Sequence, residues 1–461
     1  MRRFYQVLLI AFVVKTILAI WLPFSNDESY YWVWGHHPQW SYFDHPPMVG
    51  WIFWLGTWFE SFGNSARLPG VWLGFLTLLI WNKILEPFLH EKKRTFWLIF
   101  MLASPFFGLG SLIITPDVPL LFFWSLSLLL LLKCLEKPSA LMYAALGAAL
   151  GLGFCSKYMI VVFVPTAISW LAFTRARKQV QWHLLPLTAV FGLTFCLPVI
   201  YWNSQHDWAS FRFQLNHGLD SEKWNPGWPL EYFGGQILIL FPTVVWFAAR
   251  GLIHQTDRKS ARDETRSTSF LHFFGWFPLA FFFYTSFKAH VEANWPIMAH
   301  PAILSLALVS APNSKILRAT AALWLTVQIL VLTEVAHHWM PVDPRHLKTY
   351  EFTHFDVFIP EIEKHKPFYL GSYQSAAAVS YKMRQQTGNE TYKLNGLNRR
   401  DFYDFVPASL PKSDSFWMGV EKDQPLPEWA LKVGYRERQA YPLNDEFRVV
   451  EVERIAQDSH R

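Results

Sequence analysis

Apolar segments of roughly 17 to 22 residues recur along the chain and are separated by short polar loops. An α-helix of that length crosses about 30 Å of hydrocarbon, because it rises 1.5 Å per residue. The pattern therefore predicts an α-helical polytopic membrane protein with about eleven transmembrane helices. The predicted spans are 4–24, 67–89, 95–114, 117–133, 139–156, 158–174, 183–202, 231–250, 269–287, 295–311 and 316–336.

The pattern changes after residue 337, where the chain becomes polar. Strand-like stretches (PFYLGSY, ETYKLNG, SFWMGV and FRVVEVERI) alternate there with one helical stretch, QSAAAVSYKMRQQ. We predict a transmembrane domain over residues 1–337, whose first outer loop, 25–66, is catalytic. A small α/β domain over 338–461 is expected outside the membrane, as a lid or acceptor-docking module.

Composition agrees with a membrane protein. Residues are 52% hydrophobic and only 16% charged, which excludes an ordinary soluble domain. The three cysteines lie within or at the ends of apolar segments, so neither a disulfide framework nor a zinc pattern follows.

Basic residues identify the side that each loop faces. If the N-terminus is cytoplasmic, every basic cluster falls in a cytoplasmic loop, as the positive-inside rule requires. The net charge of +6 therefore reflects topology, and no nucleic-acid partner is expected. We predict a multi-pass protein of the bacterial inner membrane with its C-terminal domain in the periplasm. The clusters are 92–94, Lys133 with Lys137, 175–178, 250–266, and Lys315 with Arg318.

The first outer loop has unusual composition for a loop beside a membrane span. Asp27, Glu28, Asp44 and His45 lie there among tryptophans and tyrosines. Carboxylates are costly to desolvate without a partner, and aromatic walls suit the stacking of sugar rings. The plainer interpretation, helix caps beside an interfacial aromatic belt, is equally compatible with this loop taken alone.

Four other outer regions also carry ionisable residues. Taken singly, each has an ordinary explanation, such as an N-cap for Asp117 or snorkelling for Lys157. Because they recur at separate outer ends, we expect one shared substrate-binding site there. Its candidate residues beyond the first loop are Arg67, Asp117, Lys157, His206, Asp207, Arg212, Lys288, Glu292 and Asn294.

Acids and cations in one site suit glycosyl transfer from a lipid phosphate. An aspartate removes the proton of an acceptor hydroxyl, while Lys or Arg stabilises the departing phosphate. Direct displacement inverts the anomeric centre. A transporter or lipid flippase is the main competing hypothesis, although transport sites usually lie near the membrane midplane. Further hypotheses are an O-antigen or oligosaccharide ligase, a protein O-glycosyltransferase and an inactive scaffold.

These residues resemble family 39 of the GT-C glycosyltransferases. That family holds protein O-mannosyltransferases, the aminoarabinose transferase of lipid A and lipopolysaccharide galacturonosyltransferases. The resemblance rests on Asp27-Glu28 after the first span and on YFDHPPMVGW, RLPG, TPDVPLLFFW, GFCSKY and WNSQHDWASFRFQ. It extends to about residue 310, and these stretches look like the bacterial, lipid-A-related branch.

The resemblance implies specific roles and partners. Asp27 would be the catalytic base, with Glu28 beside it, and the partners would be a polyprenyl-phosphate-sugar donor, a glycolipid acceptor such as lipid A or the lipopolysaccharide core, and membrane lipids. No counterpart of the β-trefoil insert of eukaryotic members occurs, which argues against protein acceptors. We expect no metal or other cofactor to be obligatory, although the acids would also suit a divalent metal. Loss of turnover on exhaustive chelation would contradict that expectation.

Overall fold

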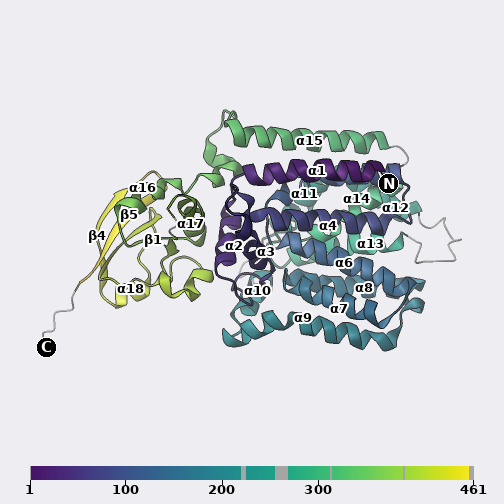
Figure 1. The fold of residues 1–461 in the computed structure, drawn as a ribbon, viewed down its shortest axis with the longest axis horizontal. Coiled ribbons are helices and arrows are strands. Elements are labelled where there is room, and N and C mark those ends of the chain that lie inside the picture. The colour runs from purple at the N-terminus through teal and green to yellow at the C-terminus, as the bar shows by residue number, and fades with distance from the viewer. Residues whose placement is uncertain (1, 220–224, 255–267, 312–313, 388–389, 456–461) are drawn as a thin grey trace. The chain divides into compact units, whose positions relative to one another are not determined.

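The computed structural model describes residues 2–219, 225–254, 268–311, 314–387 and 390–455 (Figure 1). The predicted basic cluster at 250–266 therefore lies largely outside the described residues. The chain divides into two compact units. We call them the helical unit, made of 1–21, 39–52 and 58–339, and the α/β unit, made of 22–38, 53–57 and 340–461.

The helical unit is a bundle whose described helices follow the apolar segments (Figure 1). Residues 25–66, predicted as a loop, contain helices α2 (Asn26–His36) and α3 (Met48–Gly56), and the first of these belongs to the α/β unit. The other helices up to residue 337 are α1 (Arg2–Trp21), α4 (Leu68–Leu85), α5 (Glu91–Ala103), α6 (Asp117–Glu136), α7 (Ala140–Phe154), α8 (Phe163–Phe173), α9 (Leu185–Gln205), α10 (Ala209–Leu219), α11 (Gly227–Leu240), α12 (Pro242–His254), α13 (Ser269–Ser286), α14 (His300–Ser310) and α15 (Ser314–His337).

Five of the described helical segments are long and apolar enough to cross a membrane, and a bent pair brings the number to six. The protein is a multi-pass membrane protein of α-helical type, but the expected count of eleven spans is not confirmed. Shorter helices, α7, α8 and α14, occupy the predicted spans 139–156, 158–174 and 295–311. The five long segments are Arg2–Trp21, Ser65–Leu85, Asp117–Glu136, Trp182–Gln205 and Lys315–His337.

The predicted span 231–250 is not one straight helix. It breaks between α11 and α12, which meet at a bend of 92°. Pro242 has no backbone N–H and disfavours helical geometry in the residue before it. Phe241 accordingly has a φ of +68°, in the left-handed region. The apolar pattern correctly predicted helical structure over this segment, but it did not predict the break.

Close packing of α7 against α9 depends on small residues. A Cβ atom added to Gly147 would lie 2.3 Å from the Thr188 carbonyl oxygen, and one added to Gly151 would lie 2.5 Å from that of Gly192. Membrane helices approach closely through such small residues spaced four apart, because lipid provides no hydrophobic drive for association. Helix α7 also packs on α6, and α6 packs on α4.

The α/β unit contains a five-stranded sheet with the order β2-β1-β3-β5-β4. Strand β1 is parallel to β2 and β3, with Tyr369 opposite Tyr392 and Met418, whereas β5 runs antiparallel to β3 and β4. The four predicted strands and the predicted helix are confirmed, and β4 was missed. The elements are α16 (Ile359–Lys364), β1 (Phe368–Leu370), α17 (Tyr373–Thr387), β2 (Tyr392–Lys393), β3 (Ser415–Glu421), α18 (Glu428–Lys432), β4 (Tyr435–Pro442) and β5 (Phe447–Arg454).

Alternation along the strands builds the core of this unit. Phe416, Met418 and Val420 of β3 are buried, as are Val450 and Val452 of β5. Successive side chains of a strand point to opposite faces, so residues two apart line the same face. The β4 strand lacks this signal, because most of its side chains are exposed, and a bulge between Glu437 and Gln439 interrupts its pairing.

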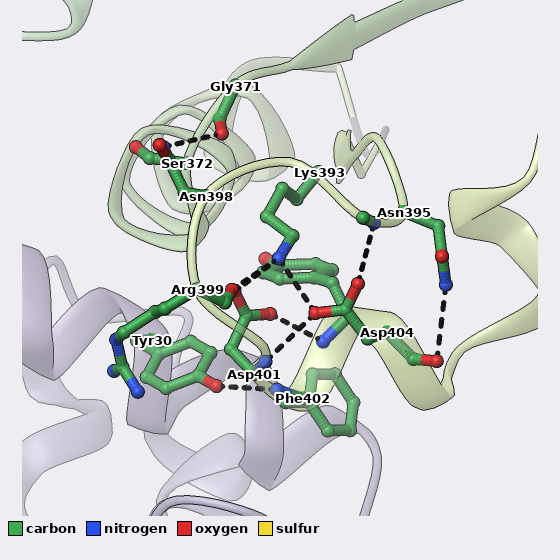
Figure 2. A network of polar contacts seen from close by, with 12 residues as sticks. Tyr30, Gly371, Ser372, Lys393, Asn395, Asn398, Arg399, Asp401, Phe402 and Asp404 are labelled. Carbon is green, nitrogen blue, oxygen red and sulfur yellow. Dashed lines mark hydrogen bonds and ion pairs between the residues drawn. The ribbon is translucent and has the colours of Figure 1, made fainter. Parts of the chain in front are cut away.

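A buried lysine organises the loop after β2 (Figure 2). Lys393 Nζ lies 2.6 Å from Asp401 Oδ2 and 2.8 Å from Asp404 Oδ2, and it donates to the Arg399 carbonyl oxygen at 3.1 Å. The side chains of Lys393 and Asp401 are 0% exposed. Asp404 also accepts hydrogen bonds from the backbone N–H groups of Gly396 and Asp401. The two carboxylates therefore share one cation, and each also accepts hydrogen bonds from backbone N–H groups, as buried charges require.

Replacing Lys393 with methionine should destabilise this unit strongly, because two carboxylates would stay buried without their cation. We expect a loss of about 3–5 kcal/mol in the free energy of unfolding, measured as a lowered thermal midpoint. Lys432→Met is the matched control, since Lys432 is 77% exposed and forms a surface pair with Glu428 at 3.4 Å. Equal midpoints for the two variants would contradict the structural role of Lys393.

Candidate functional site

Three of the predicted site residues meet in the helical unit. Lys157 Nζ lies 2.7 Å from Asp117 Oδ1, and Asn294 Nδ2 donates to Asp117 Oδ2 at 2.6 Å. The side chains of Lys157 and Asp117 are each 8% exposed. These residues are far apart in the chain, so the fold has brought a cation, an acid and an amide to one buried point.

Local structure fixes each member of this group. Asp117 is the first residue of α6 and follows Pro116, while Lys157 occupies the short turn between α7 and the 3-10 turn Tyr158–Val162. The backbone N–H of Lys157 donates to the Gly153 carbonyl oxygen at 3.0 Å. Next to Asn294, the Ala293 carbonyl oxygen accepts a hydrogen bond from the Gln236 side chain at 2.8 Å. The group is therefore held rigidly from three elements.

The turn that carries Lys157 also contacts the segment around Asp44 and the helix α10. The Met48 N–H donates to the Cys155 carbonyl oxygen at 2.9 Å, and the Tyr158 hydroxyl lies 2.9 Å from the Ser210 hydroxyl. Gln214 of α10 donates to the Asp44 carbonyl oxygen at 2.5 Å. These bonds link three segments that the sequence predicts to share a single site.

Helix α9 ends in a stacked aromatic pair that is hydrogen-bonded to the segment before Asp44. His206 stacks on Trp202 with ring centroids 4.0 Å apart, and the Trp202 indole N–H donates to the Gln39 side-chain oxygen at 2.9 Å. The His206 ring also contacts the Trp202 carbonyl oxygen at 2.7 Å through Nδ1. His206 is thus fixed in position by its own helix.

The remaining predicted residues of the helical unit have different environments. Arg67 is fully buried and donates to the Ala19 carbonyl oxygen of α1 at 3.4 Å. Asp207 and Arg212 are exposed. Lys288 is exposed and lies over the Tyr284 ring, and Glu292 lies 3.5 Å from His290. Arg67 thus supports the packing of α1, and the other four residues lie at the surface of the unit.

The two predicted catalytic acids have different environments in the α/β unit. Glu28 is 0% exposed and forms a capping box at the start of α2: its carboxylate accepts from the Ser25 N–H at 3.3 Å, and its own N–H donates to the Ser25 hydroxyl at 3.2 Å. Asp27 is exposed, and Gln374 donates to its Oδ1 at 3.4 Å. Glu28 is thus engaged structurally, whereas Asp27 stays open to a ligand.

Helix α2 packs on α17 through aromatic side chains. Phe24, just before α2, stacks on Tyr381 with centroids 4.1 Å apart, and Tyr30 contacts Tyr373 at 4.5 Å. The Tyr30 hydroxyl accepts a hydrogen bond from the Phe402 N–H at 2.8 Å, beside the Lys393 network (Figure 2). The position of Asp27 therefore depends on the sheet domain at the other end of the sequence.

The C-terminal end of α2 is attached through a hydrogen bond between His37 and Glu390. His37 lies 3.2 Å from Glu390, which also pairs with Arg384 at 2.8 Å and accepts from the Tyr392 hydroxyl at 3.2 Å. The hydrogen bond from His37 is the main cause that lowers the pKa of Glu390 to about 2, with smaller contributions from Tyr392 and Arg384. The carboxylate is charged over the whole physiological range.

The sequence patterns do not identify the three glutamines and the tyrosine that support these candidates, Gln214, Gln236, Gln374 and Tyr30. A glutamine inside an apolar helix such as α11 is a usable signal, because a buried amide needs partners. Nothing local marks Gln374, whose contact with Asp27 spans 347 residues. In the described part of the chain, no three His, Cys, Asp or Glu side chains are grouped so as to hold a metal ion.

The fold is that of a GT-C glycosyltransferase. Crystal structures of ArnT from Cupriavidus metallidurans match 97% of this chain and 97% of their own length. The form bound to undecaprenyl phosphate has a TM-score of 0.63 at 14% identity, and the apo form 0.62 at 15%. At so low a sequence identity, this similarity shows the fold alone.

Sequence comparisons point to the same family. Residues 44–202 match the family described as dolichyl-phosphate-mannose-protein mannosyltransferase. The lipid A galacturonosyltransferase RgtD of Rhizobium johnstonii is 27% identical over 298 residues. That alignment covers 62% of this chain, and the chain spans 60% of the relative's length. The predicted resemblance to GT-C family 39 is therefore confirmed.

The Glu390 ion pair makes a pH-dependent contribution to stability. Because folding lowers the pKa of Glu390, its contribution is full above the unfolded-state value of about 4.3 and declines as the pH falls towards 2. Glu390→Gln should lower the unfolding midpoint at pH 7 and make little difference near pH 2. Glu428→Gln is the control, since that carboxylate is 89% exposed. A pH-independent difference between wild type and Glu390→Gln would contradict this assignment.

Proposed function

We propose that the protein is an inverting glycosyltransferase that moves a sugar from a polyprenyl-phosphate carrier to an envelope glycolipid at the periplasmic face. The family resemblance supports the reaction class, and the relative RgtD is a transferase that acts in lipid A chemistry. The observation that carries the proposal is the contrast between Asp27, exposed at the start of α2, and Glu28, engaged in its cap.

In this proposal Asp27 is the general base. Its carboxylate takes the proton of an acceptor hydroxyl, whose oxygen then attacks the anomeric carbon of the donor sugar. The bond from that carbon to the phosphate oxygen breaks, and the polyprenyl phosphate leaves with the electron pair. Gln374 orients the carboxylate through Oδ1, which leaves Oδ2 for the proton.

Lys157 and Arg212 are assigned to the donor phosphate. Lys157 makes one side-chain hydrogen bond among the described residues, to Asp117, so two of its three N–H donors remain for a ligand. Asp117 keeps a donor in Asn294 when Lys157 binds phosphate, which lowers the cost of sharing the lysine. Arg212 is exposed on α10, which Gln214 ties to the Asp44 segment.

The other assignments follow from the topology prediction. The transmembrane domain, 1–337, carries the donor chemistry with its N-terminus in the cytoplasm, and 338–461 is a periplasmic module. The remaining candidates contribute to substrate binding: Asp44, His45, Arg67, Asp117, His206, Asp207, Lys288, Glu292 and Asn294.

Separate labelling of Lys93→Cys from the cytoplasm and Arg345→Cys from the periplasm tests the proposed orientation of the two termini.

Asp27→Asn should reduce transfer at least about 100-fold, because the amide cannot accept the acceptor proton. The measurement is turnover of the reconstituted protein with a polyprenyl-phosphate-sugar donor and a glycolipid acceptor. Glu28→Gln is the matched variant: it should weaken the α2 cap and stability while retaining far more turnover than Asp27→Asn. Near-normal turnover of a folded Asp27→Asn protein would reject the base assignment.

Lys157→Gln and Arg212→Ala should each lower kcat/KM for the donor by about 10- to 100-fold, since a hydrogen bond to a charged group contributes roughly 1.5–3 kcal/mol. The acceptor KM should change little. Arg175→Ala is the control, because Arg175 is an exposed arginine that follows the far end of α8 from Lys157. Unchanged donor kinetics in both test variants would remove these residues from the phosphate site.

A further inference from the structure

The helical unit contains a pocket at the opposite end of α6 from Asp117. Its volume is about 1040 Å³, and it lies where α4 ends, α6 ends and α7 begins. Helix α6 has 20 residues, so the pocket is roughly 30 Å from the Asp117 group along the helix axis. The proposed transfer reaction makes no use of this end of the bundle.

The pocket is amphipathic. Three lysines line it beside apolar residues from the ends of α4 and α6, the segment after α4 and the start of α7. The lysines are Lys83, Lys133 and Lys137, and the apolar residues are Ile84, Phe88, Leu129, Leu132 and Met142. A ligand that fits this lining has an anionic head and an apolar body.

Two of the three lysines form no ion pair with a carboxylate of the described residues. Lys83 pairs with Glu86 at 2.6 Å, and Arg94 lies 3.7 Å from the same carboxylate, so Glu86 is already neutralised. Lys133 and Lys137 form no ion pair among the described residues, and the Glu136 carboxylate beside them is exposed. The lining residues outside the Lys83–Glu86 pair therefore carry one net positive charge.

The start of α7 adds hydrogen-bond donors at the same place. Ser139 lines the pocket and caps α7, its hydroxyl accepting from the Met142 N–H at 3.3 Å. The first N–H groups of a helix attract anions, and lysines beside them strengthen that attraction. Positive-inside topology explains basic residues in this loop, but it does not explain a pocket with an apolar lining.

We propose that this pocket binds the headgroup of an anionic phospholipid, with the glycerol and upper acyl region against its apolar lining. Basic pockets between membrane helices are suited to such headgroups, and each cation near the membrane surface strengthens the attraction. The site is separate from the donor site, so it holds a structural or regulatory lipid of the bilayer and not the carrier.

The test uses full-length, delipidated protein in a neutral detergent. Phosphatidylglycerol is titrated while the thermal unfolding midpoint is recorded, with phosphatidylcholine and soluble glycerol 3-phosphate as separate arms. We expect the midpoint to rise with phosphatidylglycerol alone. The double variant Lys133→Gln/Lys137→Gln should weaken that response at least about tenfold in apparent affinity.

The control is Lys92→Gln/Lys93→Gln, which removes the same charge from exposed lysines in the first turn of α5 that do not line the pocket. It should respond as wild type does. Equal weakening in both double variants would overturn the proposal, because it would mean a general charge effect. A wild-type response of the pocket variant, or an equal response to phosphatidylcholine or glycerol 3-phosphate, would overturn it as well.

Discussion

A buried carboxylate loses the water that stabilises its charge, and in each unit of this protein a lysine and hydrogen-bond donors replace that water around a buried aspartate. In the helical unit Lys157 pairs with Asp117, and Asn294 donates to the same acid. In the α/β unit Lys393 pairs with Asp401 and Asp404. Removal of either lysine would leave buried carboxylates without their cation in a low-dielectric environment. The local architecture around both groups follows from this constraint.

The α/β unit links that constraint to the candidate base. The Lys393 network shapes the loop whose Phe402 N–H donates to the Tyr30 hydroxyl of α2. Helix α2 carries Asp27 at its start and is further attached through His37 and Glu390. The C-terminal domain supports the N-terminal helix α2. It therefore need not contribute reactive groups of its own. Within the proposed function, it acts by positioning Asp27.

The sequence was informative where the signal is local. Apolar lengths identified the membrane class, alternation identified four of the five strands, and the spacing Ser25-x-x-Glu28 is a capping box that the structure contains. Contacts between distant residues left no such signal: Asn294 meets Asp117 across 177 residues, and α2 joins residues after 340. The residue types alone made Asp117, Lys157 and Asn294 candidates for the site. Only the fold shows that these three are in contact, whereas other candidates such as Lys288 are exposed.

The proposed function is the addition of a sugar to an envelope glycolipid. Mass spectrometry of envelope glycolipids from cells with and without the gene tests it most directly. The proposed function predicts a glycolipid that is heavier by one sugar residue only when the gene is present. Identical glycolipid masses in the two strains, under conditions where the protein is made and inserted, would contradict it.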